Sequence, residues 1–158
     1  MLPDEVKQFI GRGVGVRMFE VEKGAIRRFA DAVDDPNPLY RDDEYARNSS
    51  YGSIIAPPGF FGWPSRLPRG APLTAESTAD LGMALAKAGY LRVLDGGMEY
   101  EFFSPIRAGD TLAASSVIKE IREREGSTGK MAFLIMETTY TNQNGDVVAK
   151  ARATSIHR

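Results

Sequence analysis

Two segments in the first half of the chain carry apolar residues with the period of an α-helix. In residues 22–34 the apolar side chains recur at i, i+3, i+4 and i+7, which predicts a helix with one buried stripe. Residues 78–88 repeat this spacing, and Gly89 is a typical residue with which to end a helix. A strand is predicted before the first helix, over residues 14–21. The stripe of the first helix consists of Ile26, Phe29, Ala30 and Val33.

From Gly97 onward the pattern changes to a period of two, which is typical of strands with one buried face. The charged run at residues 121–126 is predicted as a solvated turn. Asn144 and Gly145 predict a two-residue hairpin turn, because both tolerate positive φ. Small residues occupy one face of the last strand, so another element is expected to pack closely there. The first strand of this part begins at Gly97, and the strands that follow it are expected over residues 111–121, 131–141 and 147–156.

Residues 35–70 hold six of the nine prolines and are predicted as a long ordered loop, with a short helix beginning at Pro57 or Pro58. The order of elements is therefore strand, helix, long loop, helix and three or four antiparallel strands. This order predicts an α+β fold, in which helices pack on one face of a curved antiparallel sheet. At 158 residues, the chain is expected to form one domain over residues 1–158.

Composition excludes several kinds of chemistry. The net charge of −1 provides no basic field for nucleic acid or for a membrane surface. The chain has no cysteine, and its only histidine is His157, so thiolate and multi-histidine metal sites are excluded and no metal is expected. We expect a cytoplasmic protein, because no apolar run reaches the ~18 residues of a membrane span and the first residues lack a secretory pattern.

Three motifs carry a resemblance to a known family. Residues 29–40 read FADAVDDPNPLY, residues 51–60 read YGSIIAPPGF, and residues 104–112 read SPIRAGDTL. The first resembles the signature of MaoC-like (R)-specific enoyl-thioester hydratases, roughly F-x-x-x-[ST]-G-D-x-N-P-[LI]-H. The other two resemble later segments of the same family. The resemblance extends over nearly the whole chain and implies a hot-dog domain, in which a curved antiparallel sheet wraps around a central helix.

The resemblance also implies roles for individual residues. In the family, an aspartate and a histidine five residues apart hold the water that adds to the double bond. Asp35 matches the aspartate, Asn37 matches the motif asparagine, and the histidine position is Tyr40. A phenol with an ordinary pKa of about 10 cannot accept a proton near pH 7. The backbone N–H that stabilises the thioester oxyanion falls at Pro57 or Pro58, and proline has no N–H.

These departures are similar to those in the N-terminal halves of dehydratase domains of type I fatty acid synthases and in subunits of heterodimeric dehydratases, where the partner holds the catalytic pair. The resulting hypothesis is a non-catalytic subunit that binds an acyl thioester beside a second MaoC-like subunit. The substrate is carried on CoA or acyl carrier protein, and no other cofactor is expected. The substrate-binding residues expected are Asn37, Pro57, Pro58, Phe60, Phe61 and Trp63.

Three alternatives stay open at this point. The chain is a self-sufficient homodimeric hydratase that uses Asp35 with Tyr40, a hot-dog thioesterase that uses one carboxylate, or a scaffold that performs no chemistry. Asp35 also fits a plain turn residue, because Asp-Asp-Pro-Asn is a good turn composition.

Overall fold

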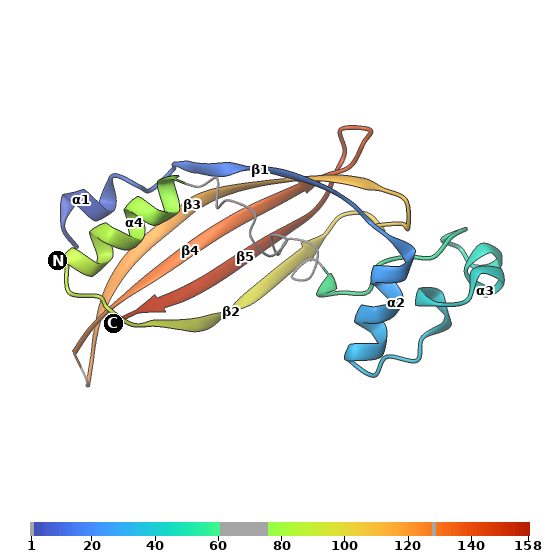
Figure 1. Ribbon diagram of the computed structural model, residues 1–158, viewed down its shortest axis with the longest axis horizontal. Helices are drawn as coiled ribbons and strands as arrows, with labels where there is room; N and C mark the ends of the chain where they lie inside the picture. The colour runs from blue at the N-terminus through green and yellow to red at the C-terminus, as the bar shows by residue number, and fades with distance from the viewer. Residues whose placement is uncertain (1, 61–75, 128) are drawn as a thin grey trace.

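The computed structural model describes residues 2–60, 76–127 and 129–158. Five antiparallel strands form one sheet in the order β1-β3-β4-β5-β2, which confirms the predicted α+β class (Figure 1). The strands are β1 (Gly13–Glu20), β2 (Val93–Phe102), β3 (Thr111–Gly126), β4 (Gly129–Thr141) and β5 (Val147–His157). The helices are α1 (Asp4–Lys7), α2 (Lys23–Ala32), the 3-10 helix η1 (Pro38–Tyr40), α3 (Asp43–Asn48) and α4 (Glu76–Lys87).

The helices cover the two ends of the sheet separately. Helices α1 and α4 lie together over one end, and α2 and α3 lie at the other end (Figure 1). Leu81 and Leu85 of α4 belong to one buried cluster with Ile118 and Ile121 of β3. No helix within the described ranges is long and apolar enough to cross a membrane.

A second buried cluster includes residues of α2 and the small residues of β5. Ile26 and Ala30 contribute to it from α2 and Phe29 packs against it, as predicted from the helical spacing. The prediction is wrong for Val33, which follows the end of α2 and is exposed. Ala149 and Ala151 of β5 lie in the same cluster, so the face of small residues is packed as expected. Buried apolar area is the main favourable term for such packing, at ~25 cal/mol per Å².

The charged run at residues 121–126 was predicted as a solvated turn at the end of a hairpin. It does lie at the end of the β3–β4 hairpin, but the prediction of a turn is wrong. The run continues β3 and pairs with β4 as far as Gly126 and Gly129. The guanidinium groups of Arg122 and Arg124 lie 5.8 and 5.7 Å from the centre of the Phe133 ring. Long basic side chains can cover a ring while their charged ends stay in water, so a charged sequence is compatible with a strand here.

Two other boundaries differ from the prediction. Strand β2 begins at Val93, before the expected residue 97, and its pairing with β5 shifts at a bulge between Asp95 and Gly97. The predicted loop contains η1 and α3. Helix α3 begins after Asp42, whose Oδ1 accepts hydrogen bonds from the main-chain N–H groups of Glu44 and Tyr45 at 3.0 and 2.9 Å. Aspartate is a preferred N-cap residue, so the sequence contained a signal for this helix, although the prolines favoured the prediction of a loop.

The segment after α3 returns to the sheet. Ile55 forms an isolated antiparallel bridge with Arg107, and the N–H of Ala56 donates to the carbonyl of Ile106 at 2.8 Å. The N–H of Phe60 donates to the carbonyl of Pro57 at 3.2 Å, which makes a turn where a short helix was predicted to begin. The rest of that predicted helix lies outside the described residues.

Helix α2 ends in a left-handed turn at Asp34. Asp34 has φ +54° and is the only non-glycine residue with positive φ among the residues described. The N–H of Asp35 donates to the carbonyl of Ala30 at 2.8 Å, which is the hydrogen bond of a Schellman helix end. This turn directs the chain from α2 into the segment that carries the candidate site residues.

The left-handed turn predicts that Asp34→Gly stabilises the protein by about 0.5–1 kcal/mol, because glycine adopts positive φ without a Cβ clash. Asp34→Ala keeps the Cβ and is expected to lower the free energy of unfolding. Urea denaturation followed by far-UV circular dichroism measures both variants. A glycine variant less stable than the wild type, with an unchanged dependence on urea, would contradict this account.

Candidate functional site

The segment after α2 is held by two successive side-chain-to-backbone turns. Oδ1 of Asp35 accepts a hydrogen bond from the main-chain N–H of Asn37 at 3.0 Å. Oδ1 of Asn37 in turn accepts one from the main-chain N–H of Leu39 at 3.1 Å and caps η1. Such turns are typical of Asp and Asn. Asp35 therefore has a turn-forming role here, whatever chemical role it has in addition.

Arg41 ties this segment back to α2. Its guanidinium lies 3.1 Å from Oδ1 of Asp31 and also donates to the main-chain carbonyl of Asp35. An arginine can hold two acceptors at once because its donors form a rigid fork. These bonds place the Asp35 backbone next to the end of α2.

Tyr40 is buried, with 7% of its surface exposed. Burial raises the pKa of its hydroxyl, and the negative charge of Asp35 and the nearby Tyr51 raise it further, while a hydrogen bond with Asn37 acts in the opposite direction. The hydroxyl therefore stays protonated at physiological pH. It can donate a hydrogen bond, but it is not a base.

A surface hollow of about 300 Å³ lies over Tyr40. It brings together the segment after α2, which ends at Tyr40, the loop after α3 and the end of β2. Of the predicted site residues, Tyr40 and Pro58 line it. The complete lining is Tyr40, Tyr51, Ile55, Ala56, Pro58, Phe102, Ser104, Pro105 and Ile106.

The other predicted site residues have different positions. Phe60 is fully buried and packs edge-on against Phe29, with 5.9 Å between ring centres, so in this structure it is part of the core. Pro57 is buried, whereas Asn37 is half-buried and has the turn role described above. Phe61 and Trp63 lie outside the described residues.

Sequence reasoning missed several residues that line this hollow. Phe102, Ser104 and Pro105 come from the end of β2 and the turn that follows it. They lie more than sixty positions from Tyr40 along the chain, so no local pattern connects the two segments. The Ser-Pro-Ile-Arg segment was recognised as a family turn, and this was the one available signal.

Comparisons with known proteins agree with this architecture. A family model described as FAS1-like, dehydratase domain region, matches residues 8–151. The chain is 32% identical over 155 residues to a UPF0336 protein of Saccharopolyspora erythraea, across 96% of this chain and 90% of the relative. It is 31% identical over 133 residues to a probable enoyl-CoA hydratase alpha subunit of Thermomonospora curvata, across 80% of this chain and 41% of the relative.

A solved structure shows the same fold. The crystal structure of the ChsH1-ChsH2 complex from Mycobacterium tuberculosis contains a chain that matches with a TM-score of 0.84 and 19% identity, over 97% of this chain and 88% of that one. The fold therefore defines a hot-dog domain. The chain belongs to the FAS1-like dehydratase family.

The two turns predict a difference between two substitutions at Asp35. Asp35→Ala removes the acceptor for the Asn37 N–H and is expected to lower the free energy of unfolding by about 1 kcal/mol. Asp35→Asn keeps an acceptor oxygen and is expected to lie within about 0.5 kcal/mol of the wild type. Urea denaturation of the three proteins tests this. Equal losses in both variants would show that the charge of Asp35, and not its turn bond, stabilises the segment.

Proposed function

We propose that this chain is a non-catalytic, acyl-thioester-binding subunit of a heteromeric (R)-specific 2-enoyl-CoA hydratase or 3-hydroxyacyl-thioester dehydratase. The hollow over Tyr40 binds the thioester, and the catalytic pair belongs to a second MaoC-like subunit. The protonated, buried Tyr40 in the motif's histidine position is the observation that carries this proposal.

Hydration of an enoyl thioester needs a group that takes a proton from water and a group that returns one to carbon. Neutral imidazole does this near pH 7, but a phenol with a raised pKa does not. Asp35 supplies one carboxylate, and one of its oxygens already holds the Asn37 N–H. One carboxylate without a second titrating group is a poor substitute for the family's pair.

The oxyanion position supports the same proposal. Family members stabilise the thioester oxygen with a backbone N–H, and the matching positions here are Pro57 and Pro58. Neither residue has an N–H to donate. Pro58 lines the hollow, and as a proline it has no N–H to offer there.

Strand β2 supports the proposed partner. It is an edge strand of the sheet, and its burial pattern is exposed along nearly its whole length. Sheet edges are normally covered or paired, and exposed apolar side chains gather at interaction surfaces. Two relatives point in the same direction, since one is named as an alpha subunit and the other is part of a complex. The exposed apolar residues on or next to β2 are Leu91, Val93, Leu94, Met98, Phe102 and Phe103.

A non-catalytic role predicts that the purified chain alone does not hydrate crotonyl-CoA or longer 2-enoyl-CoA substrates. Loss of absorbance of the conjugated double bond measures the reaction, and a MaoC-like hydratase with an intact Asp-x-Asn-Pro-x-His motif is the positive control. Robust hydration that is abolished by Asp35→Asn would instead establish a self-sufficient enzyme. Release of free CoA would establish a thioesterase.

The partner is expected to be a hot-dog chain that carries the intact motif. Co-expression with such a chain from the same genome is expected to yield a stable complex with hydratase activity. Phe103→Glu, next to the β2 edge, is expected to weaken the complex roughly tenfold or more, because it buries an unpaired charge. Met83→Glu, an equally exposed apolar position on α4, is the matched control. A homodimer that never exchanges with that chain would contradict the proposal.

A further inference from the structure

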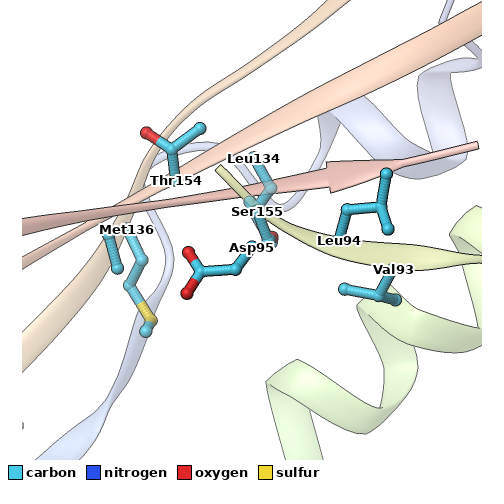
Figure 2. A pocket seen from close by; sticks show the side chains of 8 residues that line it. Val93, Leu94, Asp95, Leu134, Met136, Thr154 and Ser155 are labelled. Atoms are coloured by element: carbon cyan, nitrogen blue, oxygen red, sulfur yellow. The ribbon is translucent and has the colours of Figure 1, made fainter. Parts of the chain in front are cut away.

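A second hollow, of about 350 Å³, lies at the other end of β2. Figure 2 shows that its side chains come from β2, β4 and β5, near α4. Its walls are largely apolar, with Leu134, Met136 and Ala153 on the strands of the sheet. None of the motifs in the sequence falls on this region. The full lining is Val93, Leu94, Asp95, Leu134, Met136, Ala153, Thr154 and Ser155.

A small polar group interrupts this apolar lining. Asp95 of β2 lies directly opposite Ser155 of β5 in the strand register. The Ser155 hydroxyl lies 2.9 Å from Nε2 of His157, which is only 8% exposed. Burial lowers the pKa of His157, so its imidazole is neutral near pH 7. The hydroxyl of Ser155 is thereby held in place at the wall of the hollow.

The Asp95 carboxylate has unused capacity to accept hydrogen bonds. Its Oδ1 accepts from the N–H of Gly97 at 2.8 Å, across the bulge in β2. Its Oδ2 has no hydrogen-bond partner within the described part of the chain. Figure 2 shows the carboxylate turned toward Met136 in the hollow. An apolar ligand that displaced water here would leave this oxygen unpaired, which is unfavourable, whereas a ligand with a donor group would satisfy it.

The two hollows lie on one line along β2. Phe102 lines the hollow over Tyr40, and Asp95 lines the second hollow, seven residues away. At ~3.3 Å per residue the two are about 20 Å apart. Met98 and Tyr100 lie between them. Their partners on β5 are two and four residues away from Ser155, the partner of Asp95, so all three side chains lie on the same face of the sheet. The distance between the two hollows is within the reach of a long acyl chain whose thioester lies over Tyr40.

We infer that the second hollow binds the distal end of a long acyl chain and that Asp95 and Ser155 recognise a hydroxyl group at that end. In the His157 tautomer that carries its proton on Nε2, the imidazole donates to Ser155 and the Ser155 hydrogen is available to a ligand. A hydroxyl group can then donate to Oδ2 of Asp95 and accept from Ser155 at the same time. An ammonium group only donates, and it would lose its hydration in a largely apolar hollow against one carboxylate. The inference rests on the proposed acyl-thioester binding and adds the substrate class, an acyl chain hydroxylated far from the thioester.

Isothermal titration calorimetry on the purified full chain tests this inference, with hexadecanoyl-CoA and ω-hydroxyhexadecanoyl-CoA as probes. We expect the hydroxylated probe to bind about tenfold more tightly, because a hydrogen bond to a charged group contributes roughly 1.5–3 kcal/mol. Asp95→Leu is expected to abolish or reverse this preference. Glu99→Leu, on the opposite face of the same strand, is the matched control and is expected to leave it unchanged.

Asp95→Leu also removes the acceptor for the Gly97 N–H, so two milder variants accompany it. Asp95→Asn keeps an acceptor oxygen and Ser155→Ala leaves Asp95 intact. Each is expected to reduce the preference at least threefold while the protein stays folded by circular dichroism. Equal binding of the two probes by the wild type would overturn the inference and leave the proposed function standing.

Two further outcomes also count against the inference. Absence of binding by either probe would overturn the proposed acyl-thioester binding and the inference together. Tighter binding of ω-aminohexadecanoyl-CoA than of the hydroxylated probe would replace recognition of a hydroxyl group with recognition of a cation.

Discussion

The antiparallel pairing of β2 with β5 positions both hollows of this protein. β5 lies inside the sheet, and its small residues Ala149 and Ala151 are buried in the cluster that also contains residues of α2. β2 is the edge strand of the sheet next to β5, with one end at the hollow over Tyr40 and the other at the hollow beside Asp95. Asp95 and Met98 are three positions apart, so the regular alternation of a strand would place them on opposite faces of the sheet. The extra residue in the bulge between Asp95 and Gly97 brings both side chains to the same face.

The chemistry of the first hollow follows from the burial of Tyr40 and from the way in which the preceding segment is held. The Schellman end of α2, the two Asx turns and the Arg41 contacts make the segment well defined without any ligand. The two turns depend on Asp35 and Asn37 and not on residue 40, so the segment does not need a particular side chain at position 40 to keep its structure.

The predictions made from sequence succeeded where local periodicity carried the information. Helices α2 and α4 follow from repeated apolar spacing, and the later strands follow from alternation. The charged run at residues 121–126 was misassigned because its stabilising contacts, such as the Arg122 and Arg124 side chains on Phe133, come from another strand. No helix was predicted at α3, because the nearby prolines are typical of loops, although Asp42 is a preferred N-cap residue.

The family, the α+β class and the tyrosine at position 40 could be recognised without a structure, because motifs and local periodicity depend on residue identity over short stretches. Which distant residues share a hollow became known from the folded chain alone. Phe60 was a candidate ligand contact from its sequence and became core in the structure, whereas Asp95 and Ser155 belong to no motif and meet across two strands. The physical reason is that strand register and bulges, which place side chains on one face or the other, are set by pairing between segments far apart in the chain.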